Sequence, residues 1–388
     1  MKFSEVKRAV VAIYIDPDFY PPTINAILNL ADQMDEVIVI SRNNSTGDYP
    51  YPPNVKLKKL GKQIAVRDLE KLPVWKKLLY FLQFTLSLYR FGRKKNTDLL
   101  LLYDPLALFA FFLVKNIRRG KKVWYHNHDM PDKSRLSRFS TGVLAARYEA
   151  QAMSYIDFFS LPSKDRLVFY PNIDPSIPVF IIPNYPSLKV YRRLLQIPEQ
   201  NKKIRLIYQG FIGKGHGLET FIEILTERIN GYELNLVLKG SVTESYKEHL
   251  KKVAKSHKVS DKVSWIEIGP YSELPLLTGS CDIGIGINTN TDPVSQTQAT
   301  ASNKIYEYAA SGLPVILNNS EQFTKYLGKY TWVFFTDGTT TSICSTISVI
   351  SEQLKELKLT ARQDFEELVN FENNFCPALK VVINSKNG

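Results

Sequence analysis

The sequence predicts an α/β protein made of two doubly wound, Rossmann-like domains that face one another across a cleft. Three observations support this fold class. The chain has 388 residues, which exceeds one ordinary hydrophobic core and suits two domains of roughly 150–200 residues. Short apolar runs alternate with helical segments in both halves, and a proline-rich stretch separates the halves.

The predicted strands are short and apolar throughout, as is typical of parallel sheets covered on both faces. Those of the first half are VVAIYI (10–15), EVIVIS (36–41), LLLLY (99–103), KVWYH (122–126) and DFFSLP (157–162). Those of the second half are IRLIYQG (204–210), ELNLVLKG (233–240), VSWIEIG (263–269), CDIGIGI (281–287) and LPVILN (313–318). Helical segments between them predict right-handed βαβ units, in which ligands bind beyond the carboxyl ends of the strands.

The boundary between the two domains is predicted in the proline-rich stretch, because proline disfavours helices and removes hydrogen-bond donors from sheets. The prolines concerned are Pro171, Pro175, Pro178, Pro183, Pro186 and Pro198. We therefore expect an N-terminal domain over 1–185, a linker over 186–203 and a C-terminal domain over 204–365.

Composition excludes several classes of protein. Hydrophobic residues form 44% and charged residues 23% of the chain, which excludes a mostly disordered or collagen-like chain. Cys281, Cys344 and Cys376 lie far apart without a CxxC pair, so neither a zinc ribbon nor a disulfide framework is expected. Asp16 ends the first apolar run, and no uncharged apolar stretch reaches roughly 18 residues. We expect a cytoplasmic protein, or one on the inner face of a membrane.

Positive charge is concentrated in one segment of the first half. The net charge is +12, and residues 56–95 alone carry 12 basic and 2 acidic side chains. Such a patch favours an anionic partner, although an ordinary solvated basic surface has the same composition. Nucleic acid is not expected as that partner, because the chain shows no RNP-like pattern, no helix-turn-helix with a basic face and no zinc module.

Residues 74–95 predict a helix with an apolar centre and basic ends. The uncharged stretch from Leu78 to Tyr89 is too short to span a bilayer. The basic side chains near its ends are Lys76, Lys77, Arg90, Arg93, Lys94 and Lys95. This arrangement is typical of a helix among lipid headgroups, and a buried helix beside a sheet is the alternative. An anionic membrane surface is thus one expected partner of residues 56–95.

The segment Ser302–Leu317, SNKIYEYAASGLPVIL, predicts a helix over 303–311 followed by a strand. Ser302 is suited to cap the helix, Gly312 to end it and Pro314 to open the strand.

This predicted helix has the composition of an anion site. Its first turn, with Ser302, Asn303 and Lys304, offers free N–H groups and a positive charge to a phosphate. Glu307 shares a face with Lys304 and could accept hydrogen bonds from a ribose diol. An ordinary surface pair of Lys304 and Glu307 is the alternative.

The segment YQGFIGKGHGLETFIEIL (208–225) places glycines between a predicted strand and a predicted helix. They are Gly210, Gly213, Gly215 and Gly217. Glycines let backbone N–H groups approach a phosphate or sugar closely. The spacing matches neither a Walker loop nor GxGxxG, and a flexible turn is the alternative.

Two of the five histidines, His126 and His128, lie two residues apart at the end of a predicted strand, so their side chains should point to one face. Asp129 follows them. A histidine beside a carboxylate can act as a base or hydrogen-bond a sugar hydroxyl, and it can also bind a metal. We predict polar or catalytic roles for these three residues, with purely structural histidines and a metal site as alternatives.

Together, three segments resemble the GT-B glycosyltransferases of family 4, the group 1 enzymes of bacterial surface-polysaccharide synthesis. SNKIYEYAASGLPVI resembles their ribose-binding helix, YQG…GHGLETFIEIL the opening of their donor domain, and IIPNYPSL (181–188) the end of their first domain. The resemblance implies a nucleotide-sugar donor in the C-terminal domain and an acceptor in the N-terminal domain. It also implies retention of configuration, no metal ion, and a final helix over 366–388 that returns to the first domain.

The resemblance assigns individual donor residues. Glu307 falls on the second glutamate of the family's Glu-x7-Glu motif, and Ala299 stands at the first. Phe211 and His216 stand where the family has the Arg and Lys of its glycine-rich loop. The cations that remain for the donor diphosphate are Lys304, Lys214 and His216.

On the acceptor side, His128 and Asp129 match a His-Glu pair of the resembling family. Asp16 begins a DxD sequence, which binds metal in the separate GT-A class. Because this sequence ends the first strand, we interpret it as a turn lining the cleft, with Asp16, Phe19 and Tyr20 facing an acceptor. A plain strand-to-helix turn is the alternative.

These expectations combine into one function. We expect a glycosyltransferase that moves a sugar from a UDP- or GDP-linked donor to a saccharide or polyprenyl-linked acceptor, with His126, His128 and Asp129 as its catalytic residues. The main alternative is a catalytically weak homologue that binds nucleotide-sugar or membrane as an assembly partner. A GT-B epimerase or phosphorylase and a membrane-binding protein without chemistry are further alternatives.

Overall fold

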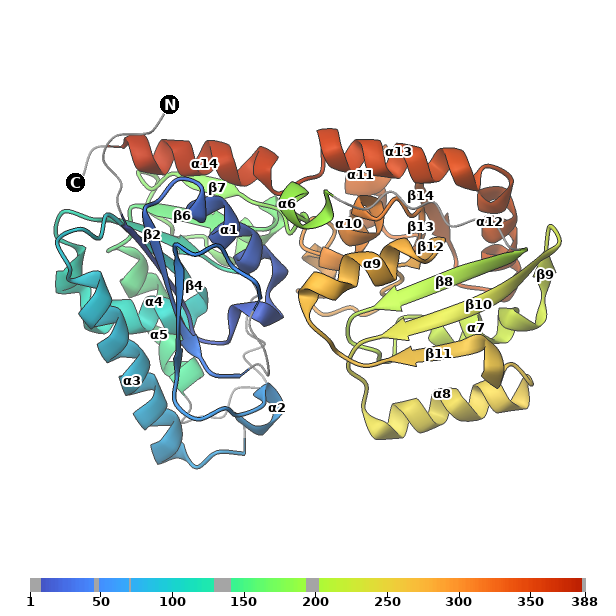
Figure 1. Cartoon of the computed structure of the whole chain (residues 1–388), viewed down its shortest axis with the longest axis horizontal. Helices are drawn as coiled ribbons and strands as arrows, with labels where there is room; N and C mark the ends of the chain where they lie inside the picture. Colours follow the sequence, from blue (N-terminus) through green and yellow to red (C-terminus); the bar gives the residue numbers. More distant parts are fainter. Residues whose placement is uncertain (1–7, 45–48, 70, 129–140, 193–201, 386–388) are drawn as a thin grey trace. The chain divides into compact units, whose positions relative to one another are not determined.

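The chain folds as two compact units, each built on one sheet (Figure 1). Unit 1 comprises Met1–Pro183 and Phe371–Gly388, and unit 2 comprises Asn184–Asn370. The residues that the computed structural model describes are 8–44, 49–69, 71–128, 141–192 and 202–385.

The sheet of unit 1 has seven parallel strands. Their spatial order is β3 (Val55–Leu60), β2 (Glu36–Arg42), β1 (Arg8–Ile13), β4 (Leu99–Tyr103), β5 (Lys122–His126), β6 (Phe158–Leu161) and β7 (Val179–Ile181). The order reverses between β1 and β4, where Ile13 pairs with Tyr103. A crevice for a ligand is favoured at such a reversal, beyond the carboxyl ends of the strands.

The sheet of unit 2 repeats this plan. Its parallel strands lie in the order β11 (Val263–Ile266), β10 (Tyr232–Lys239), β8 (Lys203–Gln209), β12 (Ile283–Ile285), β13 (Val315–Asn318) and β14 (Val333–Thr336). The short β9 (Arg228–Ile229) pairs antiparallel with β10 and completes seven strands. The order reverses between β8 and β12.

Helices cover both faces of the unit 1 sheet. They are α1 (Pro21–Ala31), α2 (Val66–Leu69), α3 (Val74–Gly92), α4 (Asp104–Leu113), α5 (Thr141–Met153) and α14 (Glu372–Asn384). On one face, α1 and α14 pack Ile27 and Leu379 against the strands. On the other face, α3, α4 and α5 contribute side chains such as Phe84 and Leu108 to the core. Because both faces are covered, the inner strands are mostly apolar, whereas the edge strand β3 carries lysines.

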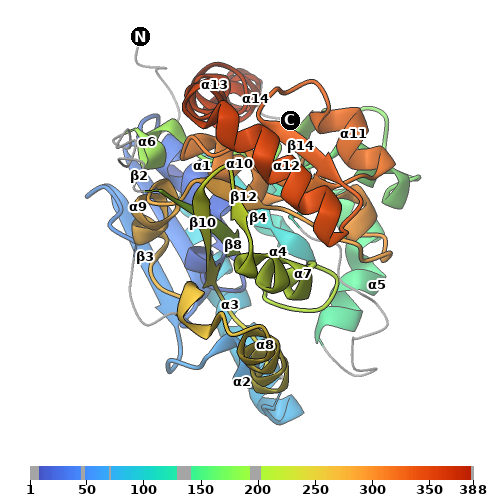
Figure 2. The same ribbon diagram turned by 90° about the vertical axis from the view of Figure 1, so that its right-hand side faces the viewer.

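Unit 2 has its own set of covering helices. They are α6 (Leu188–Tyr191), α7 (Leu218–Glu223), α8 (Glu244–Ser256), α9 (Leu274–Gly279), α10 (Asn303–Ala310), α11 (Glu321–Leu327), α12 (Thr340–Glu352) and α13 (Leu354–Glu367). Figure 2 faces this unit and shows α7, α8 and α12, whose Phe221, Leu250 and Ile347 pack on one side of the sheet. On the opposite side, the Tyr308 ring of α10 lies against Gly284 of β12, which leaves no room for a larger residue there.

The predicted fold class, two doubly wound α/β domains with parallel sheets, is confirmed. Every predicted strand corresponds to a strand of the structure; the ends of β4 and β5 are as predicted, and each of the others differs at one or both ends. The prediction missed β3, β7, β9 and β14. β3 was missed because lysines interrupt the apolar pattern of its sequence, VKLKKL. Two of these lysines form ion pairs with Glu36 and Asp16 at the edge of the sheet.

The predicted helix of residues 74–95 is α3, which ends at Gly92. Among the described helices, none combines the length and hydrophobicity that a membrane span requires.

Candidate functional site

The helix α10 leads from the carboxyl end of β12 back toward β13, so its first turn lies at the carboxyl edge of the unit 2 sheet. Ser302 occupies the N-cap position, but its side chain caps no N–H group, and the predicted capping bond is therefore wrong. Its ψ is 107°, whereas the capping residues Ser163, Ser187 and Thr339 have ψ of 137°, 139° and 153°. The side-chain Oδ1 of Asn303 is also buried without a partner among the described residues.

Glu307 lies one turn into α10 and is 4% exposed. Gln209, the last residue of β8, donates a hydrogen bond from Nε2 to Oε2 of Glu307 at 2.6 Å. Thr278 fixes the Gln209 amide by donating to Oε1 at 2.9 Å. Burial raises the pKa of Glu307 to about 7, although Gln209, Tyr271 and Lys304 act in the opposite direction. Glu307 is thus a buried carboxyl group that changes charge near neutral pH.

Lys304 points from the same helix toward the end of β8. Its Nζ donates to the Tyr208 hydroxyl at 2.9 Å and lies 4.2 Å from the centre of that ring. The Tyr208 hydroxyl in turn donates to the Phe211 carbonyl at 2.8 Å. Desolvation lowers the pKa of Lys304 to about 7, with Glu307 opposing the shift. Lys304 and Glu307 therefore share one site, and they are not the ordinary surface pair that was the alternative.

The glycine-rich segment begins directly beside Lys304. Gly210 has φ +125°, and Lys304 Nζ lies 3.8 Å from where a Cβ at this position would stand. Gly215 and Gly217 also have positive φ, of +86° and +66°, which side chains rarely adopt. Gly213 has an ordinary φ, but a Cβ there would overlap the Phe211 ring. Gly210, Gly215 and Gly217 are therefore required by the backbone, whereas at Gly213 an added Cβ would displace the exposed Phe211 ring.

The predicted cations of this segment differ from one another. Lys214 is exposed. His216 is buried, and its Nδ1 hydrogen-bonds the Ile287 carbonyl at 2.9 Å. Burial, together with repulsion from Lys304, lowers the pKa of His216 to about 4. The low pKa favours a neutral His216 at pH 7, against the expectation that it supplies a positive charge.

The two positions that depart from the resembling family lie in different environments. Ala299 is buried, its N–H donates to Gln322 at 3.2 Å, and its carbonyl accepts from the Tyr306 hydroxyl at 2.9 Å. Phe211 is exposed. Gln209, Tyr208 and Thr278 were not predicted, although Gln209 directly precedes the first glycine and lies one position before the end of a predicted strand.

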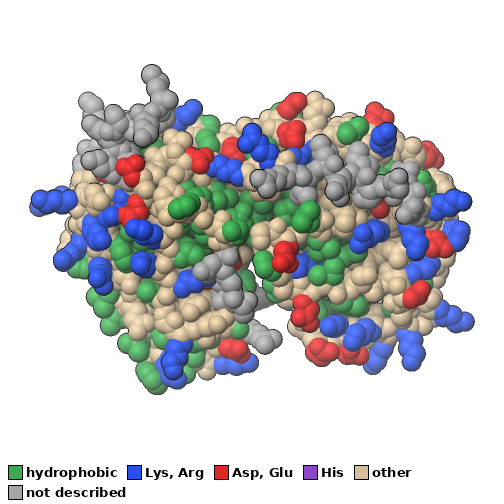
Figure 3. Space-filling view, in the orientation of Figure 1, with side chains coloured by type: hydrophobic (Ala, Val, Ile, Leu, Met, Phe, Trp, Pro, Cys, Tyr) green, Lys and Arg blue, Asp and Glu red, His purple; other side chains and the backbone are tan. Residues whose placement is uncertain are grey.

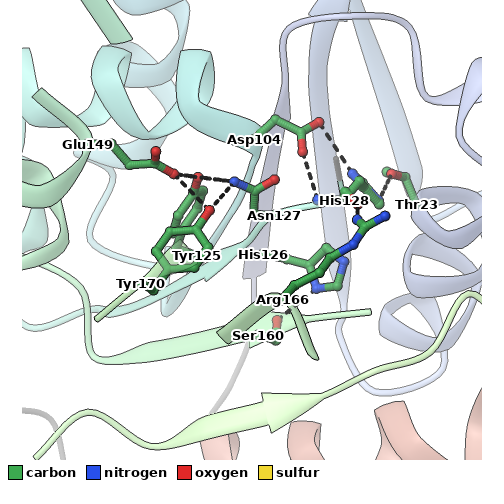
Figure 4. Close-up of polar contacts among 10 residues, drawn as sticks. All are labelled: Thr23, Asp104, Tyr125, His126, Asn127, His128, Glu149, Ser160, Arg166 and Tyr170. Carbon is green, nitrogen blue, oxygen red and sulfur yellow. Dashed lines mark hydrogen bonds and ion pairs between the residues drawn. The ribbon is translucent and has the colours of Figure 1, made fainter. Parts of the chain in front are cut away.

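In unit 1, His128 lies just beyond the carboxyl end of β5 (Figure 4). Its Nδ1 lies 3.3 Å from Oδ2 of Asp104, and its backbone N–H donates to Oδ1 of Asp104 at 2.9 Å. The Nδ1 that faces the carboxylate carries the proton, so Nε2 accepts a hydrogen bond from the Thr23 hydroxyl at 3.1 Å. Tyr103 and Tyr20 stack on the ring at centroid distances of 4.6 and 5.1 Å. His128 is 2% exposed and both ring nitrogens are engaged.

Asp104 directly follows β4 and begins α4 with φ +65°. A positive φ is costly for a residue other than glycine, and such conformations cluster at functional sites. Its side chain is 25% exposed, in contrast to the buried His128. Asp104 was not predicted, although its place beyond the carboxyl end of a predicted strand next to that of His128 was a usable signal.

The other two predicted catalytic residues do not join this pair in the same way. His126 stacks edge-on to His128 at 4.8 Å, and its Nδ1 lies 2.8 Å from the Ser160 hydroxyl. Burial lowers the pKa of His126 well below its usual range, with His128 and Arg166 adding to the effect, so that this ring stays neutral. Asp129 lies outside the described residues.

A second polar cluster lies beside His128 in Figure 4. Oε1 of Glu149 accepts hydrogen bonds from the hydroxyls of Tyr125 at 2.6 Å and Tyr170 at 3.1 Å, and from the Asn127 amide at 3.3 Å. Arg166 donates to the His128 carbonyl. These contacts fix the backbone on both sides of the His128 ring.

The three predicted acceptor-side residues lie in different environments. Tyr20 stacks on His128 and belongs to this site. Asp16 is buried, ion-paired with Lys59 at 2.7 Å, and accepts from the Asp18 N–H at 3.2 Å. Phe19 is exposed. The role of Asp16 is therefore to hold the turn in place.

Comparison with solved structures shows which known proteins share this architecture. Sucrose-phosphate synthase from Thermosynechococcus elongatus matches with a TM-score of 0.67 and 12% identity, over 97% of this chain and 98% of that one. HepE from Anabaena, in complex with UDP and glucose, matches with a TM-score of 0.66 and 12% identity, over 97% and 99%. WaaG, a glycosyltransferase involved in lipopolysaccharide biosynthesis, matches with a TM-score of 0.64 and 13% identity, over 97% and 100%.

At these identities the matches show the fold, and the chain has the GT-B fold along nearly its whole length. No protein-family model matches the sequence. No curated protein matches it by sequence.

Proposed function

We propose that the chain is a glycosyltransferase that transfers a sugar from a nucleotide-sugar to a saccharide or polyprenyl-linked acceptor in polysaccharide biosynthesis. The observation that carries this proposal is the pair of the partly buried Lys304 and the buried Glu307 beside the Gly210 turn, at the carboxyl edge of the unit 2 sheet. A site of this kind offers a cation and free N–H groups to a diphosphate and a carboxylate to a ribose.

In this proposal unit 2 binds the donor. The first turn of α10, with Ser302, Asn303 and Lys304, holds the diphosphate, and Glu307 accepts hydrogen bonds from the ribose hydroxyls. The acceptor oxygen attacks the anomeric carbon while the bond from that carbon to the diphosphate oxygen breaks. Lys304 and the helix N-terminus stabilise the negative charge that develops on the departing nucleotide, which is commonly the largest contribution to such catalysis.

Unit 1 binds the acceptor in this proposal. The partly exposed Asp104 carboxylate contacts the acceptor hydroxyl and takes up its proton. His128 holds Asp104 through two hydrogen bonds and is itself held by Thr23. The resemblance of the sequence to family 4 enzymes favours retention of configuration at the anomeric carbon.

The nucleobase of the donor can be chosen for testing from the ligands of similar structures. HepE has been solved with UDP-glucose and the trehalose-6-phosphate protein from E. coli with UDP-2-fluoro glucose. These structures support UDP-linked sugars as the first donors to test, with GDP-linked sugars second.

Nucleotide release tests this function. Purified protein is incubated with UDP- and GDP-sugars and a mixture of saccharide and polyprenyl-linked acceptors, and the freed nucleotide is measured. We expect acceptor-dependent release with one nucleotide class, abolished by Glu307→Gln. The matched control Glu352→Gln changes an exposed carboxylate at the end of α12 and should have no effect. Equal release by Glu307→Gln and wild type would refute the proposal.

A second candidate function is a catalytically weak homologue that binds nucleotide-sugar as an assembly partner. The buried Ala299 and the exposed Phe211 at family-specific positions favour it. Nucleotide binding that depends on Glu307, combined with no sugar transfer to any acceptor, would support this candidate.

A further inference from the structure

The helix α3 is apolar on two opposite sides. Phe81, Phe84 and Leu88 pack against the sheet of unit 1. The opposite side is exposed to solvent, with Trp75 at 62% and Leu86 at 56% exposure. The exposed apolar side chains of α3 are Val74, Trp75, Leu78, Leu79, Leu82 and Leu86.

The spacing of these residues aligns them along one stripe. Trp75, Leu78, Leu82 and Leu86 are separated by three, four and four residues, which repeats one side of a helix at each turn. Figure 3 shows hydrophobic side chains gathered over the lower left of the molecule, where α3 lies in Figure 1. A single exposed leucine needs no explanation, but a continuous apolar stripe over several turns marks an interaction surface.

The charge around this stripe has one sign. The range Val74–Gly92 contains no Asp or Glu. Arg90, Arg93, Lys94 and Lys95 are exposed at its carboxyl end, and none of them forms an ion pair within the described part of the chain. Lys76 lies near its start, with Nζ 5.4 Å from the Trp75 ring.

We propose that the exposed side of α3, from Trp75 to Leu86 with the basic groups that follow, docks unit 1 onto an anionic lipid bilayer. The helix lies parallel to the surface, with its leucines among the acyl chains and its basic groups against lipid phosphates. Trp75 has an amphipathic ring of the kind enriched at this depth. A second copy of the chain fits this surface less well, because two such helices would bring their positive charges together.

The first turn of α3 lies at the same edge of the unit 1 sheet as the proposed acceptor site. α3 follows β3 and precedes β4, so its first turn with Trp75 lies at the carboxyl edge of the unit 1 sheet. His128 and Asp104 lie at the same edge. Docking along α3 therefore brings this edge near the bilayer, where a polyprenyl-linked acceptor would present its saccharide. The docking itself does not depend on the proposed transferase activity.

Vesicle flotation with the full chain tests the proposal. Vesicles of equal parts phosphatidylglycerol and phosphatidylcholine are compared with vesicles of phosphatidylcholine alone. We expect binding to the anionic vesicles only, since each basic group near an anionic surface strengthens binding about fivefold. Changing Arg90, Arg93, Lys94 and Lys95 to Gln should weaken it about a hundredfold or more.

The apolar stripe is tested by Leu82→Glu combined with Leu86→Glu. We expect this variant to lose vesicle binding while keeping the far-ultraviolet circular dichroism spectrum of the wild type. The matched control, Leu359→Glu with Leu368→Glu, changes leucines of unit 2 that are equally exposed, and it should bind like wild type. Absence of binding by the wild type, or unchanged binding by Leu82→Glu with Leu86→Glu, would overturn the proposal.

Two further readouts separate the occupants of this surface. Trp75 fluorescence should shift to shorter wavelength on anionic vesicles. Trp75→Phe should remove the shift, because Trp124 and Trp332 are buried and the partly buried Trp265 packs on the core of unit 2. Light scattering after gel filtration should show the same mass for wild type and Leu82→Glu with Leu86→Glu. A dimer that this variant dissociates, without vesicle binding by the wild type, would assign the surface to a second copy and overturn the membrane proposal.

Discussion

The affinity of unit 2 for UDP should depend steeply on pH because of Lys304. Burial beside Tyr208 lowers the pKa of Lys304 to about 7. An anionic diphosphate binds the protonated form. The affinity should therefore fall as pH rises above that pKa, while the substitution Lys304→Arg, which keeps its charge at every pH tested, should remove the dependence.

The magnitude follows from the protonated fraction of Lys304. With a pKa of about 7, half of the molecules carry the charge at pH 7 and about one in a hundred at pH 9. The affinity for UDP should fall about fiftyfold across this interval, or about 1.4 kcal/mol per pH unit once the group is mostly neutral. The second phosphate ionisation, near pH 6, is already about nine-tenths complete at pH 7 and changes the affinity little over this range.

Isothermal titration of UDP at about pH 7, 8 and 9 measures this dependence directly. We expect the Kd of the wild type to rise steeply and the Kd of Lys304→Arg to change by less than about threefold. A wild-type Kd that is constant over the interval would refute the reasoning, because it would mean that Lys304 is fully charged throughout or does not contact the phosphates.

Three further predictions concern stability and the two units. Burial raises the folded-state pKa of Glu307 to about 7, so the stability contributed by its protonated form is lost as pH rises from the unfolded pKa through about 7. Glu307→Gln should therefore raise the free energy of unfolding by about 2–3 kcal/mol at pH 8, measured by urea denaturation. An unchanged free energy of unfolding would contradict the burial argument. Gly210→Ala should destabilise unit 2 by about 1–3 kcal/mol because φ is +125° there, with Gly279→Ala, where an added Cβ meets nothing, as its control in thermal denaturation. Asp104→Asn should lower sugar transfer about 10²–10⁴-fold and leave the Kd for UDP unchanged, since Asp104 belongs to unit 1; a changed Kd would show a structural role.

The hydrophobic pattern predicted the strands well because buried parallel strands are apolar on both faces. It failed at β3, where Lys56 and Lys59 form ion pairs with Glu36 and Asp16. An edge strand can carry such side chains because one of its sides meets solvent. The partners of these lysines come from β2 and from the turn after β1, so the pairing depends on strand order, which the local sequence does not contain.

The candidate site was predicted only in part. Lys304 and Glu307 were found because three-residue spacing on a helix is a local feature. His216 was predicted as a cation, yet its charge is suppressed by burial and by Lys304, which lies far from it in sequence. The contacts of Glu307 with Gln209, and of His128 with Asp104, likewise arise where separate strands end side by side.

The capping bond expected of Ser302 shows a second limit of prediction from the sequence. Residue type predicted the N-cap position correctly, but the Ser302 side chain makes no hydrogen bond to an N–H group of the helix. The preceding loop is held by Gln322 through hydrogen bonds to the N–H groups of Gln298 and Ala299 at 3.1 and 3.2 Å. Residue type therefore predicts where the helix begins without predicting that the capping bond forms.

A thermal-shift panel with UDP, GDP, ADP and CMP tests the central claim, that unit 2 binds a nucleotide through Glu307. At a concentration of about 100 times Kd, a ligand that binds only the folded state stabilises it by about 2.7 kcal/mol. We predict that one nucleotide raises the melting temperature by about 5–10 °C. The shift should be absent in Glu307→Ala and retained in the control Glu352→Gln. The account is contradicted if no nucleotide shifts the wild type, or if Glu307→Ala responds as the wild type does.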